Sequence, residues 1–192
     1  SRCDLRLDVG PTTSGQRRVG VMVACALFAI ALSGSLVTAN RSKYNDEELW
    51  QQRSQQFATG LVTGDLNRLT AYDVNFDTTS VSITMPGVPT LWVGSLVIIA
   101  ECVSDTTPSS LRTCVERSTG PALPNVHRAM ALLGAALVAL LWLVSRRLLV
   151  TMTALLACLL IATEPFLTAL RTMFHTDSLV MSFSLIGFVA FC

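Results

Sequence analysis

The sequence contains little charge. Charged residues make up 14% of its 192 residues, whereas 51% are hydrophobic and the mean hydropathy is +0.53. A soluble domain carries about 25% charged residues, so this composition excludes an ordinary soluble protein and indicates an integral membrane protein. The net charge of +1 provides no electrostatic basis for binding nucleic acid.

The six cysteines do not form the pattern of a disulfide framework. Cys25, Cys158 and Cys192 lie in apolar runs, where a reduced thiol packs as a small hydrophobic group. Cys102 and Cys114 bracket a polar loop. They either pair, if the loop faces an oxidising compartment, or remain two free thiols.

The run from Val19 to Ala39 has 21 residues without a charge, enough for one helix across a bilayer. The alternative is a cleaved signal peptide, but the apolar region of such a peptide usually has only about 7–15 residues. Arg17 and Arg18 precede the run. Positive charge before a span predicts a cytoplasmic N-terminus, with Asn40 onward outside.

Three further apolar runs are candidates for membrane contact. Two of them predict spans over 128–145 and 148–165, each close to the length of about 20 residues that a bilayer requires. The third run, over 88–101, is shorter and contains Pro89 and Gly94. It either crosses the membrane or lies on its surface as an interfacial helix.

Arg146 and Arg147 decide between these two topologies. If the run over 88–101 crossed, both arginines would lie outside; if it lies on the surface, they fall in a cytoplasmic turn, as the positive-inside rule prefers. Asp46 and Asp177 then face one compartment. The last apolar run is too short to cross, so we expect the chain to be the N-terminal part of a longer protein. The expected segments are a cytoplasmic tail (1–18), span 19–39, an external loop (40–127), spans 128–145 and 148–165, an external loop (166–177) and the start of a fourth span (178–192).

Three consecutive acids follow the first span closely, in the stretch YNDEELW at 44–50. Asn45 or Asp46 can cap a helix, and Glu48 lies three residues after Asn45 as in a capping box. Acids in a first turn also complement the helix dipole. A capping role therefore accounts for Asp46, Glu47 and Glu48 unless other evidence selects one of them.

The rest of the external loop is expected to contain interfacial helices at 45–59 and 88–101. One side of the first helix is suited to the membrane interface. That side consists of Leu49, Trp50, Arg53, Phe57 and Leu61. Asp73 and Asp77 are predicted in turns, and residues 104–126 are predicted to be irregular because Pro108, Pro121 and Pro124 interrupt them.

Six motifs follow one another along the chain: NDEELW (45–50), GD (64–65), MPGVPTLWVGSL (85–96), HRAMALL (127–133), SRRLL (145–149) and TEPFLTALRTMFHTDSLVMSF (163–183). In order and spacing, over nearly all of the chain after Val19, they resemble the opening of glycosyltransferase family 39. These membrane enzymes of the GT-C superfamily use polyprenyl-phosphate sugars and include protein O-mannosyltransferases and bacterial aminoarabinose transferases. The resemblance implies an all-α multispan helical bundle with a helical first extracytoplasmic loop, in a plasma or inner membrane.

The resemblance also implies site residues. It matches Asp46 to the catalytic acid of the first external loop, with Glu47 beside it, and Asp177 to the second essential acid. This sequence departs from the family at Met85, where other members have a histidine or an acid before the Pro-Gly turn. A role of that position in binding a metal or the lipid phosphate is therefore in doubt.

Sugar transfer from a lipid phosphate needs a base for the acceptor hydroxyl and positive charge for the departing phosphate. Asp46 fits the base, and the resemblance implies inversion at the sugar. Arg171 and Arg128 match basic residues of the family, and the guanidinium fork of Arg171 suits phosphate oxygens. Simpler roles stay open: Arg171 as an interface anchor and Asp177 as the N-cap of the last helix.

His175 lies two residues before Asp177. With Asp46 and Asp177 it is a candidate ligand of a divalent metal ion, the one cofactor considered, although a single histidine near a cap is also ordinary polar surface. The expected partners are a polyprenyl-phosphate-sugar donor, a lipid or protein acceptor and membrane lipids. A non-catalytic scaffold is the alternative; a transporter is disfavoured because no predicted span has an ionisable residue at its centre.

Overall fold

The computed structural model describes residues 14–39, 47–65, 68–69, 71–76, 79–84, 89–105 and 110–191. The described residues are mostly helical, as expected, and include one two-stranded hairpin that was not expected. The chain divides into two compact units. We call them the bundle unit (Ser1–Ser42, Met130–Met173 and Asp177–Cys192) and the loop unit (Lys43–Ala129 and Phe174–Thr176).

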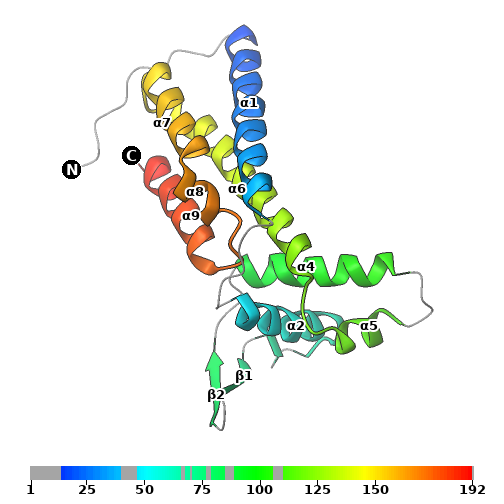
Figure 1. Cartoon of the computed structure of the whole chain (residues 1–192). Helices are drawn as coiled ribbons and strands as arrows, with labels where there is room; N and C mark the ends of the chain where they lie inside the picture. The colour runs from blue at the N-terminus through cyan, green and yellow to red at the C-terminus, as the bar shows by residue number, and fades with distance from the viewer. Residues whose placement is uncertain are drawn as a thin grey trace. The chain divides into compact units, whose positions relative to one another are not determined.

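The bundle unit consists of helices (Figure 1). They are α1 (Ser14–Thr38), most of α6 (Leu123–Ser145), α7 (Thr151–Thr163), α8 (Pro165–Leu170) and most of α9 (Thr176–Phe191). Its core combines small residues of α1 with residues of α6 and α7, such as Ala24, Trp142 and Cys158. Two of these helices, α1 and α6, are long and apolar enough to cross a membrane.

Helix α1 buries a stripe of mostly small residues and exposes large apolar ones. The buried residues are Gly20, Ala24, Leu27, Ala31 and Ser35. Small residues allow helices to approach closely. At Gly20, the indole Nε1 of Trp142 donates to the backbone oxygen at 3.0 Å. Val21, Met22 and Val37 are exposed on α1, as expected for residues that contact lipid.

The loop unit contains α2 (Glu47–Thr63), β1 (Ala71–Phe76), β2 (Thr79–Thr84), α4 (Pro89–Ser104), α5 (Leu111–Arg117) and the first turns of α6. The strands form an antiparallel hairpin whose register runs from Ala71 opposite Thr84 to Phe76 opposite Thr79. Helices α2 and α4 lie side by side, and α5 packs against both (Figure 1).

The contact between α2 and α4 combines polar and apolar groups. Ser95 Oγ donates to the Ser54 backbone oxygen at 3.0 Å. The rings of Phe57 and Trp92 meet edge to face with centroids 5.1 Å apart. Because Phe57 is almost fully buried, this packing removes the apolar side of α2 from solvent, and the hydrophobic effect stabilises the pair.

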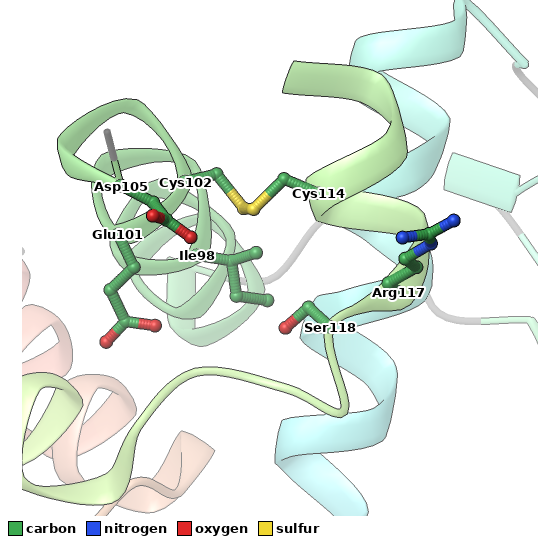
Figure 2. Close-up of a pocket in the computed structure, with 7 residues that line it drawn as sticks. All are labelled: Ile98, Glu101, Cys102, Asp105, Cys114, Arg117 and Ser118. Carbon is green, nitrogen blue, oxygen red and sulfur yellow. A yellow bond between two sulfur atoms is a disulfide. The ribbon is translucent and has the colours of Figure 1, made fainter. Parts of the chain in front are cut away.

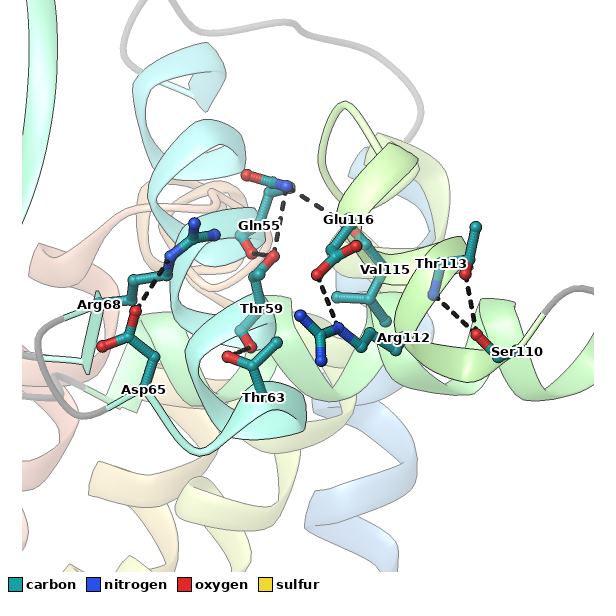
Figure 3. A network of polar contacts seen from close by, with 10 residues as sticks. All are labelled: Gln55, Thr59, Thr63, Asp65, Arg68, Ser110, Arg112, Thr113, Val115 and Glu116. Atoms are coloured by element: carbon teal, nitrogen blue, oxygen red, sulfur yellow. Dashed lines mark hydrogen bonds and ion pairs between the residues drawn. The ribbon is translucent and has the colours of Figure 1, made fainter.

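Helix α5 is held by a cap at its start and by side chains of α2 (Figure 3). Ser110 Oγ accepts from the Thr113 amide at 3.3 Å, which satisfies one of the free amides of the first turn. Gln55 Nε2 lies 3.5 Å from the Val115 backbone oxygen and 3.4 Å from Thr59 Oγ1. These contacts fix a short helix that would not persist alone in water.

Several expectations for the external loop are wrong in detail. Residues 104–126 are not irregular throughout, because α5 lies within them and α6 already begins at Leu123. Pro124 is the second residue of α6, and proline is tolerated in a first turn because the amide it lacks has no helical partner there. Asp73 lies in β1 rather than in a turn, and Asp77 lies outside the described residues.

Helix α2 also differs from its prediction. It runs to Thr63 instead of Thr59, and Gly64 follows with a φ of 73°, a conformation that favours glycine. The side predicted to contact the membrane is covered by protein, since Trp50, Arg53 and Phe57 are all buried. The predicted cap residues Asn45 and Asp46 lie outside the described residues.

Candidate functional site

A buried acid and a buried histidine meet in the loop unit. Glu47, the first residue of α2, is 1% exposed, and its Oε1 lies 2.7 Å from Nε2 of His127 in α6. The same oxygen accepts a hydrogen bond from the Phe174 amide at 3.2 Å. One carboxylate oxygen therefore joins three segments that are far apart in the sequence.

Trp50, three residues after Glu47 in α2, makes two further contacts with polar side chains of the loop unit. The Trp50 ring meets the His175 ring edge to face at 5.6 Å, and the Arg53 guanidinium lies 4.8 Å from the centre of the Trp50 ring. A cation over an indole face is attracted by the ring quadrupole. Trp50 and Arg53 are buried. We call this set the Glu47 cluster: Glu47, Trp50, Arg53, His127, Phe174 and His175.

The cluster brings together only part of the predicted site. Glu47 and His175 belong to it, whereas Asp46 lies outside the described residues. Asp177 is exposed in the first turn of α9, which begins at Thr176, so it lies inside the helix and not at the predicted N-cap position; it belongs to the bundle unit. Arg128 is exposed on α6 beside His127.

Arg171 makes contacts of its own inside the bundle unit. Its Nη1 donates to the Ile161 oxygen at 2.7 Å and its Nη2 to the Ala162 oxygen at 2.8 Å. Two hydroxyls, of Thr168 and Ser35, accept from Nη2 and Nε at 2.9 and 3.4 Å. A guanidinium has five N–H groups, so binding a phosphate in bidentate fashion would require Arg171 to release some of these partners.

These contacts explain why an arginine can be buried at the end of α7. The last carbonyl groups of a helix lack amide partners, and a cationic side chain near them also complements the helix dipole. Burial lowers the pKa of Arg171, and Glu164 opposes this effect. Arginine nevertheless stays protonated in proteins, so a charged group binds the end of α7.

The sequence reasoning missed His127. It singled out Arg128 from the motif HRAMALL, but the structure buries His127 against Glu47 and leaves Arg128 exposed. The available signal was rarity, because the chain has only two histidines and both belong to the Glu47 cluster. The pairing of residues 47 and 127 depends on tertiary contacts that no local pattern encodes.

No metal site emerges from the part of the chain that the structure describes, where no three His, Cys, Asp or Glu side chains gather in a suitable group. Asp46, one of the three predicted ligands, lies outside that part. Of the three predicted metal ligands, the described residues therefore include only His175 and Asp177. We derive no chemical step through a metal ion.

A cavity of about 390 Å³ lies beside α4 and α5 (Figure 2). Cys102 and Cys114 form a disulfide in its wall, with their Cα atoms 5.8 Å apart, so the paired alternative for these cysteines is confirmed. Glu101 of α4, Asp105 directly after α4 and Arg117 of α5 line the cavity. The disulfide links the two helices beside the cavity.

Comparison with models of known protein families, with curated proteins and with solved structures finds no match. Within the part of the chain that the structure describes, the fold is largely helical and includes two helices that are long and apolar enough to cross a membrane.

Proposed function

We propose that this protein acts as a membrane glycosyltransferase that moves a sugar from a polyprenyl-phosphate donor to an acceptor hydroxyl on the extracytoplasmic side. The ordered motifs, which resemble glycosyltransferase family 39, suggest this chemistry. The hydrogen bond between the Phe174 amide and Glu47 carries the proposal. Asp46 directly precedes Glu47, and Asp177 follows Phe174 by three residues.

Chain connectivity makes this hydrogen bond informative. Consecutive Cα atoms are about 3.8 Å apart, so the Cα atom of Asp177 lies within about 11 Å of that of Phe174, and Asp46 is one step from Glu47. Both acids are thus tethered to a bond that joins residues 127 positions apart. This supports a shared site, in which Asp46 deprotonates the acceptor hydroxyl and Asp177 assists.

A phosphate-binding group is also needed. Arg171 already donates to protein oxygens in the bundle unit, whereas Arg128 is exposed next to the Glu47 cluster. We therefore assign binding of the departing phosphate to Arg128 in preference to Arg171, since a guanidinium pairs well with phosphate oxygens. His175, half-buried against Trp50, is assigned to the same substrate-binding region.

Contacts inside the bundle unit support the proposed orientation. Arg146 Nη2 donates to the Gln16 oxygen at 3.3 Å, so the start of α1 lies at the end of α6. Arg17, Arg18, Arg146 and Arg147 therefore mark one end of this helix pair, as the positive-inside rule expects for the cytoplasmic side. The disulfide lies in the loop that leaves from the other end, and disulfides persist in oxidising compartments.

The test compares the acids in membranes that contain the protein. Asp46→Asn and Asp177→Asn are each expected to reduce sugar transfer from a polyprenyl-phosphate donor by about 100-fold or more, because general acid–base groups contribute factors of that order. Glu116→Gln is the control, since Glu116 forms an exposed ion pair with Arg112 and lies outside the six motifs. Unchanged transfer in either of the first two variants would exclude the proposed roles.

A non-catalytic scaffold is the second candidate. Glu47 is buried and hydrogen bonded, and Asp177 lies in the first turn of α9, so both have structural contacts that need no catalysis. A scaffold would keep its assembly function in both Asp→Asn variants. The same pair of variants therefore separates the two candidates.

A further inference from the structure

The Cys102–Cys114 disulfide forms part of the wall of the cavity beside α4 and α5 (Figure 2). Both cysteines are half-buried, whereas Val115, the residue after Cys114, is fully buried. The cavity volume of about 390 Å³ lies within the range of pockets that admit small molecules. This placement gives a small thiol a route to the sulfur atoms that does not require unfolding.

Charged residues are distributed unevenly around the two cysteines. Glu101 directly precedes Cys102, and Asp105 follows it by three residues. Arg117 follows Cys114 by three residues in α5, a spacing that makes two side chains neighbours on a helix surface. All three charged residues line the cavity. A nearby cation stabilises a thiolate and nearby acids disfavour it, so Cys114 is the better leaving group.

Besides the disulfide, α5 has modest contacts in the part of the chain that the structure describes. The helix has seven residues, of which only Val115 is buried. Val115 packs with Ala58 of α2 and Ile98 of α4. Gln55 Nε2 lies 3.5 Å from the Val115 oxygen, which is long for a hydrogen bond. A helix this short does not persist alone in water, so opening the disulfide is expected to release it.

We propose that this disulfide is a redox-active site, at which a dithiol reductant enters the cavity, opens the disulfide and releases α5 from α4. A thiolate of the reductant forms a bond with Cys102 Sγ, the bond between the two cysteines breaks, and its electron pair leaves with Cys114 beside Arg117. The second thiolate of the reductant then attacks the mixed disulfide and displaces Cys102. The reductant becomes a disulfide, and its two protons pass to the cysteines. All these residues belong to the loop unit, so the proposal depends neither on the membrane spans nor on sugar transfer.

The charges that line the cavity also predict which thiols react fastest. Two acids and one arginine line it, and the acids are sequence neighbours of the attacked Cys102. The cationic thiol cysteamine should therefore react faster than the anionic 2-mercaptoethanesulfonate, by about threefold or more at low salt. Each rate is divided by the rate of the same thiol with the chain unfolded in urea, which cancels differences in intrinsic reactivity. High salt should abolish the preference because it screens exposed charges.

Timed reduction of the full chain in detergent micelles tests the proposal, with dithiothreitol as the reductant. Free thiols are alkylated and located by mass spectrometry. The disulfide of the folded chain is expected to react within about 100-fold of its rate in urea, because access to the sulfur atoms does not require unfolding. The amides of α5 are then expected to exchange faster with solvent, and reoxidation should restore their protection.

Substitutions on α5 test the assigned leaving group. Arg117→Gln is expected to slow the reaction about threefold, because the Cys114 thiolate loses its nearby cation. Arg117→Lys should restore the rate. Arg112→Gln is the matched control, since Arg112 lies on the same helix and pairs with Glu116.

Three outcomes would overturn the proposal. A folded chain that reacts more than about 100-fold slower than the chain in urea would mean that only unfolding exposes the sulfur atoms. A mixed disulfide of cysteamine on Cys114 instead of Cys102 would refute the direction of attack. Unchanged exchange of α5 after reduction would show that packing holds the helix without the disulfide. Sugar transfer is measured separately, so failure of this test is distinct from failure of the proposed activity.

Discussion

The two acids that open α2, Glu47 and Glu48, differ in their surroundings. Glu48 is exposed, in keeping with an ordinary first-turn acid, whereas Glu47 is fully buried and pairs with His127. A buried carboxylate is costly unless it is paired and hydrogen bonded. His127 and the Phe174 amide provide those partners, so Glu47 fastens the start of α2 to two distant segments.

Replacing His127 tests this connection. His127→Ala is expected to lower the free energy of unfolding by about 3 kcal/mol, because removing one partner of a buried pair leaves the other without compensation. Thermal unfolding in detergent micelles measures the loss. The control is Arg112→Ala, which removes a surface ion pair with Glu116 and should change stability by about 0.5 kcal/mol or less. Equal stability of the two variants would contradict a structural role for the pair.

Arg171 illustrates how a single residue type supports different interpretations. From the sequence it was a phosphate clamp or an interface anchor, and both roles place its charge toward solvent or ligand. The structure directs it to the carbonyl groups of Ile161 and Ala162 at the end of α7. Its match to the family therefore does not by itself establish phosphate binding, which stays a prediction.

Among the elements, α2 and α4 depend on a glycine for their close approach. A Cβ atom at Gly94 would lie 2.6 Å from Phe174 Cζ and 2.7 Å from Ser54 Cβ. Gly94→Ala is therefore expected to destabilise the protein by about 1–3 kcal/mol through overpacking. Gly187→Ala is the matched control, because nothing lies within 4 Å of a Cβ atom there. The control should be neutral or gain up to about 1 kcal/mol from helix propensity, and equal melting temperatures for both variants would refute the close contact.

The disulfide fastens α5 to α4. Its cysteines are separated by 12 positions, and closing a loop of about this size contributes about 3 kcal/mol in the chain-entropy model. Cys102→Ser together with Cys114→Ser is expected to speed hydrogen exchange in α5 strongly while leaving the bundle unit unchanged. Cys25→Ala, which removes a cysteine outside the disulfide, is the control. Slow exchange of α5 in the double serine variant would show that packing alone holds the helix.

Element boundaries were predictable where the signal was local. The run of uncharged residues located α1, although the helix begins at Ser14, before the arginines. The region over 88–101 became α4 at Pro89–Ser104. The missed elements have weak local signals: α5 is short and needs a disulfide and the Gln55 contact, and the hairpin has Asp73 and Asn75 in a strand, where such residues are depleted.

For the whole molecule, the proposed topology makes a direct prediction. In sealed vesicles, single cysteines replacing Glu116 and Asp177 are expected to react with a membrane-impermeant maleimide from one side, and a cysteine replacing Arg147 only from the other. The reason is that the basic turn after α6 should stay in the cytoplasm. Labelling of positions 116 and 177 from opposite sides would place the two acids in different compartments and contradict a shared site.

The sequence alone determined the kind of environment in which each segment is stable. Long uncharged runs, arginine pairs and glycine or proline breaks act over a few residues or through solvent preference, so α1, α6 and the helical character of the chain could be read directly. Only the tertiary structure decided which partners the polar residues take. Glu47 with His127 and the Phe174 amide, Arg171 with Ser35, and the apolar side of α2 against α4 are contacts across tens to more than a hundred residues. Such pairings follow from packing, because a buried polar group must take whichever partner the fold brings within reach.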